Sequence, residues 1–163
     1  MMQKGLSGFR RFLAVVETEP DIVDAKDAKP LENVKGTVEY KDVSFHYSDD
    51  DTLVLSDVSF RIDAGKSIAL VGPSGSGKTT ICSLLPRFYD VTGGSIRIDG
   101  KDIRSLSLES LRNNIGLVQQ DVYLFCGSIK DNISYGKPGA SIEEIIDAAK
   151  KANIHDFIMS LPD

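Results

Sequence analysis

A glycine-rich octapeptide holds the residue types of this sequence that are best suited to chemistry. Residues 72–79 read Gly-Pro-Ser-Gly-Ser-Gly-Lys-Thr, which matches the pattern Gly-x-x-x-x-Gly-Lys-Ser/Thr at each fixed position. Glycines allow a tight turn and let successive backbone N–H groups approach phosphate oxygens without a side-chain clash. We expect Lys78 to reach the β- and γ-phosphates of a nucleotide and the Thr79 hydroxyl to coordinate Mg²⁺. The candidate phosphate-binding residues are Gly72, Ser74, Gly75, Ser76, Gly77, Lys78, Thr79 and Thr80, with Lys78 also the candidate catalytic residue.

The segments on either side of this loop are those that a phosphate-binding loop needs. Residues 67–71 include a continuous apolar run, as expected of a strand buried on both faces. After the loop, Ile81, Leu84, Leu85 and Phe88 share one helical face. A helix that begins near Lys78 would direct its first amides and the positive end of its dipole at the same anion. The loop and its flanking segments therefore predict a nucleotide-binding site, but the loop alone does not distinguish kinases, GTPases, helicases and transporters.

Before the loop, apolar and polar residues alternate as in β-strands that have one solvent-exposed face. Apolar residues alternate at 38 and 40, continue out of phase at 43 and 45, and alternate again at 58, 60 and 62. Such strands are most often antiparallel. The change of phase predicts a bulge near Lys41 and Asp42.

After the loop the expected elements are shorter. Residues 94–100 predict a hairpin arm, and residues 107–113 a short helix. Residues 115–118 are a second candidate for a buried strand. Ser141 and Glu144 have the spacing of a capping box ahead of an amphipathic helix.

The first 35 residues differ from the rest. Leu6, Phe9, Leu13 and Val16 fall on one face of a short helix, with two arginines on the other side. Residues 17–32 follow with six acids and two prolines, which predicts a solvated linker. The apolar face would serve as a docking or coiled-coil surface or pack locally on the main domain; both alternatives stay open.

Composition narrows the class of protein. The chain has 163 residues with 19 basic and 24 acidic side chains, a formal charge of −5, so one domain is the default. The acidic balance argues against a nucleic-acid partner that would need a broad basic face. Cys82 and Cys126 are too far apart to form a paired metal or redox motif. Apolar runs reach four or five residues, whereas a bilayer span needs roughly 18.

Several further stretches, in order along the chain, resemble the ATP-binding cassette domain of ABC transporters of the exporter type. They are Val-Ser-Phe-His-Tyr at 43–47, Leu-Ser-Asp-Val-Ser-Phe at 55–60, Leu-Pro-Arg-Phe-Tyr-Asp at 85–90, residues 94–100, Val-Gln-Gln-Asp at 118–121, and residues 125–136. The resemblance covers residues 36–163. It implies an α/β fold, a P-loop NTPase core with a mostly parallel central sheet plus an antiparallel β-subdomain, truncated at its C-terminus.

The resemblance assigns two further site residues. Tyr47 occupies the position of the aromatic residue that stacks on adenine, and Gln120 that of the glutamine which contacts Mg²⁺ or its water. Apart from the resemblance, Tyr47 lies 25 residues before Gly72 at the edge of a β-rich segment, where its planar ring could offer a π-face to a base, with a half-buried strand tyrosine as the alternative. Gln120 by itself reads as a surface polar residue, so its role rests mainly on the resemblance. The cofactors implied are ATP and Mg²⁺.

The resemblance also implies an assembly. Residues 1–35 would be the helix and acidic linker that follow a transmembrane domain, and residues 36–163 the first part of the nucleotide-binding domain. The partners would be the transmembrane domain of the same transporter and a second nucleotide-binding domain. The location would be the cytoplasmic face of the cell membrane, with the parent an integral membrane protein.

Motifs that the family needs for hydrolysis are missing from these 163 residues. We find no Leu-Ser-Gly-Gly-Gln signature and no apolar run ending in Asp-Glu after Lys78. We therefore expect the chain to bind ATP with Mg²⁺ and to hydrolyse little or none of it. The alternative is a free-standing P-loop NTPase or kinase, but residues 115–118 are followed by glutamines and not by the aspartate such enzymes use for Mg²⁺. A nucleotide-gated interaction module is a third possibility.

Overall fold

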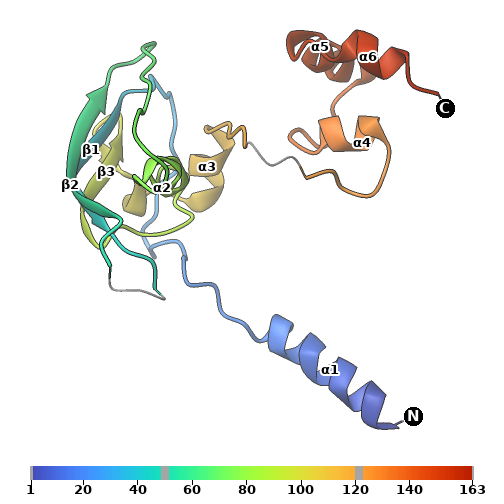
Figure 1. Cartoon of the computed structure of the whole chain (residues 1–163), viewed down its shortest axis with the longest axis horizontal. Helices are drawn as coiled ribbons and strands as arrows, with labels where there is room; N and C mark the ends of the chain where they lie inside the picture. Colours follow the sequence, from blue (N-terminus) through green and yellow to red (C-terminus); the bar gives the residue numbers. More distant parts are fainter. Residues whose placement is uncertain (1, 49–51, 120–122, 163) are drawn as a thin grey trace. The chain divides into compact units, whose positions relative to one another are not determined.

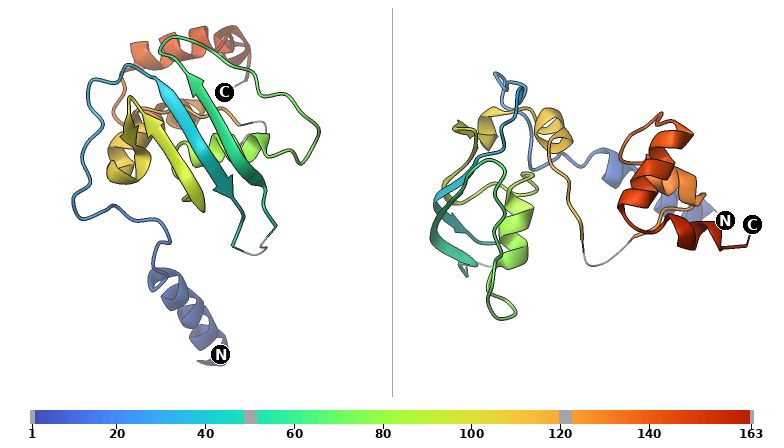
Figure 2. Two further views of the ribbon diagram at one scale, coloured as in Figure 1. Left: turned by 90° about the vertical axis from the view of Figure 1, so that its left-hand side faces the viewer. Right: turned by 90° about the horizontal axis from the view of Figure 1, so that it is seen from above.

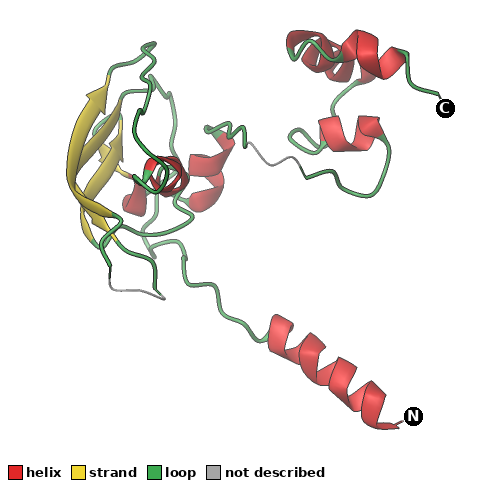
Figure 3. Ribbon diagram, viewed as in Figure 1, coloured by secondary structure: helices red, strands yellow, loops and turns green. Residues whose placement is uncertain are grey.

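The computed structural model describes residues 2–48, 52–119 and 123–162, and only the backbone of residues 2–8. The chain divides into two compact units, residues 1–117 and residues 118–163. The first unit holds the β-sheet and helices α1 to α3, and the second holds helices α4 to α6 (Figure 1). Strands are confined to the first unit among the described residues (Figure 3).

The sheet is antiparallel and has the strand order β2-β1-β3-β4. Its strands are β1 (Val38–Phe45), β2 (Leu55–Ile62), β3 (Gly93–Ile98) and β4 (Lys101–Asp102). The pairing of β1 with β2 shifts register between Tyr40 and Val43, and Asp42 has a φ of 50°. These strands confirm the antiparallel part of the predicted fold, the hairpin arm and the bulge.

Three helices and a 3-10 turn complete the first unit. They are α1 (Met2–Val16), α2 (Lys78–Leu84), η1 (Ile103–Ser105) and α3 (Leu108–Asn113). Helices α2 and α3 lie on the same side of the sheet (Figure 2). The helix predicted after the loop ends at Leu84, so the exposed Phe88 lies beyond it, after Arg87 with its φ of 54°.

The core of the first unit lies between the sheet and helices α2 and α3. Burying each large apolar side chain there contributes about 1.5–3 kcal/mol relative to leaving it in water. The buried core residues include Tyr40, Val43, Phe45, Leu55, Ile96 and Ile98 of the sheet, Leu84 of α2 and Leu111 of α3.

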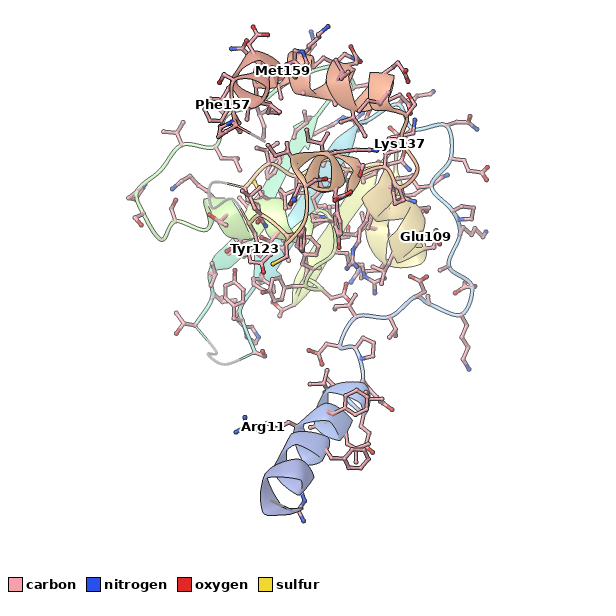
Figure 4. All side chains as sticks on the ribbon, turned by 90° about the vertical axis from the view of Figure 1, so that its right-hand side faces the viewer. Arg11, Glu109, Tyr123, Lys137, Phe157 and Met159 are labelled. Carbon is pink, nitrogen blue, oxygen red and sulfur yellow. The ribbon has the colours of Figure 1, made fainter. Side chains whose placement is uncertain are left out.

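The second unit is helical. Its helices are α4 (Ile129–Ser134), α5 (Ile142–Lys151) and α6 (His155–Met159). The predicted capping box of Ser141 and Glu144 is confirmed at the start of α5, and α4 begins with a second one. Ile145 and Ala149 are buried on α5, whereas the labelled Phe157 and Met159 of α6 are exposed (Figure 4).

Both predictions of a buried parallel strand are wrong in this structure. Residues 67–71 and 115–118 have no regular secondary structure, and Val71 and Val118 are 92% and 97% exposed. A strand buried on both faces needs hydrogen-bonded neighbours on its edges. No strand pairs with either segment within the described ranges, so most of their apolar side chains are exposed, although Ile115 still packs against the core.

The acidic segment after α1 is attached to the fold at its far end, against the expectation of a solvated linker. Leu31 is 5% exposed and belongs to the core, and Lys29 forms a parallel bridge with Leu106. Helix α1 itself carries exposed apolar residues, among them Phe9 and Phe12, while the labelled Arg11 projects from the helix (Figure 4). None of the helices described here combines the length and apolar character that crossing a bilayer requires.

Candidate functional site

The glycine-rich loop connects β2 to α2 and closes around a lysine ammonium group. Lys78 Nζ donates hydrogen bonds to the carbonyl oxygens of Gly72 at 2.8 Å and Pro73 at 2.7 Å. It also donates to Ser76 Oγ at 3.2 Å. The loop therefore curls back over its own lysine, which places a fixed positive charge at its centre.

Glycine is required at 77 because the loop packs against the start of β2. Gly77 has a φ of 82°, a conformation that residues with a side chain rarely adopt. A Cβ there would lie 2.6 Å from Leu55 Cδ2 and 3.2 Å from the carbonyl oxygen of Val54. At Gly72 a Cβ would lie 2.7 Å from Ser76 Oγ. The core residue Leu55 thus supports the loop, and a side chain at 77 would displace it, whereas a side chain at 72 would require the exposed Ser76 hydroxyl to rotate.

The start of α2 offers backbone donors to an anion. The first N–H groups of a helix have no intrahelical acceptor, and the N-cap here is Gly77, which makes no side-chain cap. The amides of Lys78, Thr79 and Thr80 lie in this first turn, where the helix dipole also favours negative charge. Ser74 and Thr79 are exposed, so their hydroxyls are accessible. This set of amides, an ammonium group and a hydroxyl suits a polyphosphate with its Mg²⁺.

Tyr47 lies beside the same helix. Its hydroxyl shares a 3.1 Å hydrogen bond with Oγ1 of Thr80, which is buried. Its ring packs edge-on against Phe45, with centroids 4.9 Å apart, and against Tyr89, with centroids 5.2 Å apart. The structure therefore brings Tyr47 to the first turn of α2, and Thr80 uses its hydroxyl to hold the tyrosine.

The site prediction for Gln120 cannot be compared with the structure in the same way. Gln120 lies outside the described residues. Nδ1 of His46 is 3.1 Å from the carbonyl oxygen of Tyr47, so that histidine contacts the chain beside the site. Sequence reasoning missed the supporting roles of Leu55 and Tyr89. Leu55 and Tyr89 each fell in a stretch that carried the family resemblance, but neither had a sequence spacing that signalled its contact with the loop or with Tyr47.

Two arginines, Arg87 and Arg112, fix the segment that follows the end of α2. Arg87 is 6% exposed and donates to Asp90 through Nε at 2.7 Å and Nη2 at 3.0 Å. The hydrogen bond to Asp90 raises the pKa of Arg87 above its usual value, against the opposing effect of desolvation. Arg112 of α3 donates to the carbonyl oxygens of Pro86 at 3.1 Å and Arg87 at 2.9 Å. Helix α2 is thereby tied to α3.

Comparison with known proteins places this site in a family. The ABC transporter family model matches residues 55–162, which include the loop and α2. The ATP-binding protein YwjA, an ABC transporter protein of Bacillus subtilis (strain 168), is 49% identical over 163 residues, covering all of this chain and 28% of YwjA. An ATP-dependent lipid A-core flippase of Syntrophus aciditrophicus (strain SB) is 48% identical over 162 residues, covering 99% of this chain and 27% of the flippase.

A solved structure agrees with these relatives. It is that of a bacterial Atm1-family ABC exporter with ATP bound, with 42% identity and a TM-score of 0.86. The match covers 98% of this chain and 28% of the exporter chain, so the present chain spans little more than a quarter of the proteins it matches. The family match also decides against a free-standing kinase or unrelated NTPase. The chain belongs to the ABC transporter family and carries part of its ATP-binding domain.

Proposed function

We propose that residues 72–80 bind the phosphates of ATP and its Mg²⁺, and that the whole protein is an exporter ATPase. The observation that carries the first part is the loop itself, closed around Lys78 Nζ and followed by uncapped amides at the start of α2. The exporter assignment is supported by the relatives, which include a lipid A-core flippase and putative multidrug export proteins.

Each residue of the site has a part in this proposal. Lys78 neutralises the β- and γ-phosphates and, in the whole protein, the charge that develops on the γ-phosphate during transfer. Thr79 and Gln120 are the residues that would hold Mg²⁺, which when bound offsets phosphate charge. Tyr47 offers a half-buried ring to the adenine base. The glycines at 72, 75 and 77 keep side chains out of the phosphate site.

The whole protein would work at the cytoplasmic face of the cell membrane. Its partners in this proposal are a transmembrane domain of the same transporter and a second nucleotide-binding domain. ATP binding and hydrolysis would be coupled to export of a substrate. Helix α1 and the acidic segment after it are the proposed connection to the transmembrane domain.

Binding without turnover is the activity that we propose for residues 1–163 by themselves. The sequence lacks an apolar run ending in Asp-Glu after Lys78 that could supply a general base, and it lacks the signature motif. The two events can be measured separately, as nucleotide affinity and as phosphate release.

A calorimetric titration tests the proposal. Mg-ATP and Mg-ADP should bind with similar affinity, whereas AMP should bind at least tenfold more weakly because it lacks the β- and γ-phosphates that Lys78 would contact. Phosphate release should not exceed the background without protein. Equal affinity for AMP and ATP would contradict the phosphate assignment, and steady turnover would contradict the proposed division between binding and hydrolysis.

A further inference from the structure

Residues 24–31, called the strap below, lie along η1 and α3 in the first unit. Lys29 N–H donates to the carbonyl oxygen of Ser105 at 3.0 Å, and Ser107 N–H donates back to that of Lys29 at 2.9 Å. Leu31 N–H donates to Ser110 Oγ at 2.7 Å, and the Leu31 side chain is buried in the core. The strap is therefore part of the folded unit and not a loose tether to α1.

Asp24 provides the outermost attachment of the strap. Its Oδ1 accepts a 2.7 Å hydrogen bond from the N–H of Leu108, the first residue of α3. The N-cap of this helix, Ser107, makes no side-chain cap bond. Asp24, which lies 84 positions before Leu108, supplies the acceptor at this helix start instead. A carboxylate at this end of a helix is also favoured by the helix dipole.

The strap reaches the nucleotide site through only two helices. Helix α3 is held by the strap at its start and, through Ser110, along its length. Arg112 of α3 donates to the carbonyl oxygens of Pro86 and Arg87, and its guanidinium lies 5.3 Å from the centroid of the Phe88 ring. These carbonyls follow the end of α2, which begins at Lys78.

Electrostatic interactions also connect the strap with Arg87, which follows α2. The carboxylates of Asp90 and, less strongly, Asp24 both act on the guanidinium of Arg87. Nη1 of Arg87 is buried without a hydrogen-bond partner in the described part of the chain. The carboxylate of Asp24 therefore accepts from the first amide of α3 and also favours the charged form of Arg87, which follows the end of α2.

We propose that the grip of the strap on α3 is coupled to nucleotide binding at residues 72–80. This rests on the proposed nucleotide site. Coupling of this kind is reciprocal: nucleotide must strengthen the strap by the same factor by which the strap strengthens nucleotide binding. A chain of packed helices and hydrogen bonds supplies the physical connection.

Amide exchange on the whole 163-residue chain measures one direction of the coupling. With saturating Mg-ATP, exchange at Leu31 and Leu108, whose N–H groups join the strap to α3, should slow by about threefold or more. Exchange at Lys78 and Thr79 reports in the same sample whether nucleotide is bound. If Mg-ATP slowed exchange at Lys78 and Thr79 but left exchange at Leu31 and Leu108 unchanged, the coupling would be overturned and the nucleotide site would stand.

Variants measure the other direction. Asp24→Ala should weaken Mg-ATP binding by about threefold to tenfold, and Asp24→Asn by less because the amide oxygen still accepts from Leu108. Asp27→Asn is the matched control: it removes a neighbouring exposed acid for which the described part of the chain provides no hydrogen bond or ion pair. Folding of each variant is checked by the unchanged exchange of core amides such as Tyr40.

The outcomes separate the two proposals. Affinity of Asp24→Ala equal to that of Asp27→Asn would overturn the coupling while nucleotide binding stands. If the unmodified chain showed neither binding nor loop protection, the nucleotide site would fail and the coupling with it. If Asp24→Ala did not fold, the exchange experiment on the unmodified chain would still decide.

Discussion

At the scale of single residues, the loop depends on a few close contacts that leave no space. Gly77 combines a left-handed backbone with a close approach to Leu55, and Lys78 fills the ring of loop oxygens. Both constraints act on the same few atoms. Substitutions here should therefore change nucleotide binding more than they change the stability of the fold.

Gly77→Ala tests this at the point of closest packing. The added methyl group would meet Leu55 and the Val54 carbonyl in a strained conformation, so the loop must move. We expect at least a tenfold loss of Mg-ATP affinity and a fall of about 1–2 kcal/mol in the free energy of unfolding. Gly65→Ala is the control, since Gly65 has a similar φ of 72° and no atom within 4 Å of the added Cβ. Equal affinity losses in the two variants would show that backbone strain, and not packing on Leu55, is responsible.

Asp99 makes the stability of the first unit sensitive to acid. Desolvation raises the pKa of its carboxyl group, but backbone hydrogen bonds from Thr37, Lys35 and Gly36 outweigh this and lower the pKa below its usual value. A carboxyl group whose pKa is lower in the folded state stabilises the fold above the unfolded pKa of about 3.9. That contribution is lost as the pH falls through the folded pKa.

Urea unfolding between pH 2.5 and 7 measures this effect. Asp99→Asn should be less stable than the parent chain at pH 7, and the difference should shrink as the pH falls below about 4. Asp27→Asn should follow the parent at every pH. A constant difference between Asp99→Asn and the parent across the range would mean that the lost hydrogen-bond geometry matters and the charge does not.

At the scale of elements, the second unit shows how one side chain can hold a turn. Asn132 of α4 accepts from Phe125 N–H at 2.8 Å and donates to its carbonyl oxygen at 3.0 Å. This places the Phe125 ring against that of Tyr135, with centroids 4.5 Å apart and planes 22° from parallel. The aromatic pair therefore depends on an amide side chain.

Asn132→Ala should release this turn. The change removes both bonds to Phe125 and a third to the Ser128 carbonyl oxygen. Because this backbone is exposed, we expect a decrease of about 1–2 kcal/mol in local stability, seen as amide exchange at Phe125 roughly tenfold faster. Lys130→Ala, an exposed change in the same helix, should leave that exchange unchanged. Unaltered exchange at Phe125 in Asn132→Ala would show that the aromatic stack alone maintains the turn.

The elements also show what local sequence can and cannot predict. The alternation in β1 and β2, the bulge at Asp42 and the capping box at Ser141 were all predictable, because each depends on residues close together in the chain. Residues 67–71 and 115–118 have the apolar runs of buried strands, yet a strand forms only where another pairs with it.

Contacts between distant residues explain the rest of what the sequence could not reveal. Tyr47 and Thr80 are 33 positions apart, and Asp24 and Leu108 are 84 apart. Neither pair has a spacing that signals contact. The acidic composition of residues 17–32 also concealed the single apolar side chain, Leu31, that fixes the strap to the core. The loop residues of the candidate site were predictable because their chemistry lies in one short motif.

At the scale of the whole molecule, the two units carry different parts of a family domain. The first holds the phosphate loop and Tyr47, and residues 1–117 form it. The second holds α4 to α6, and the family match runs through both to residue 162. The family resemblance seen in the sequence is confirmed by this match. The proposed exporter function and the proposed coupling therefore both depend on nucleotide binding by the first unit.

The most direct test is the affinity for Mg-ATP of Lys78→Ala against that of Lys66→Ala. Lys66 is an exposed lysine on the same connection, so its loss removes an equal charge without touching the loop. We predict that Lys66→Ala binds within about twofold of the parent chain and that Lys78→Ala binds at least tenfold more weakly. Equal affinities for the two variants would contradict the assignment of the loop as the nucleotide site.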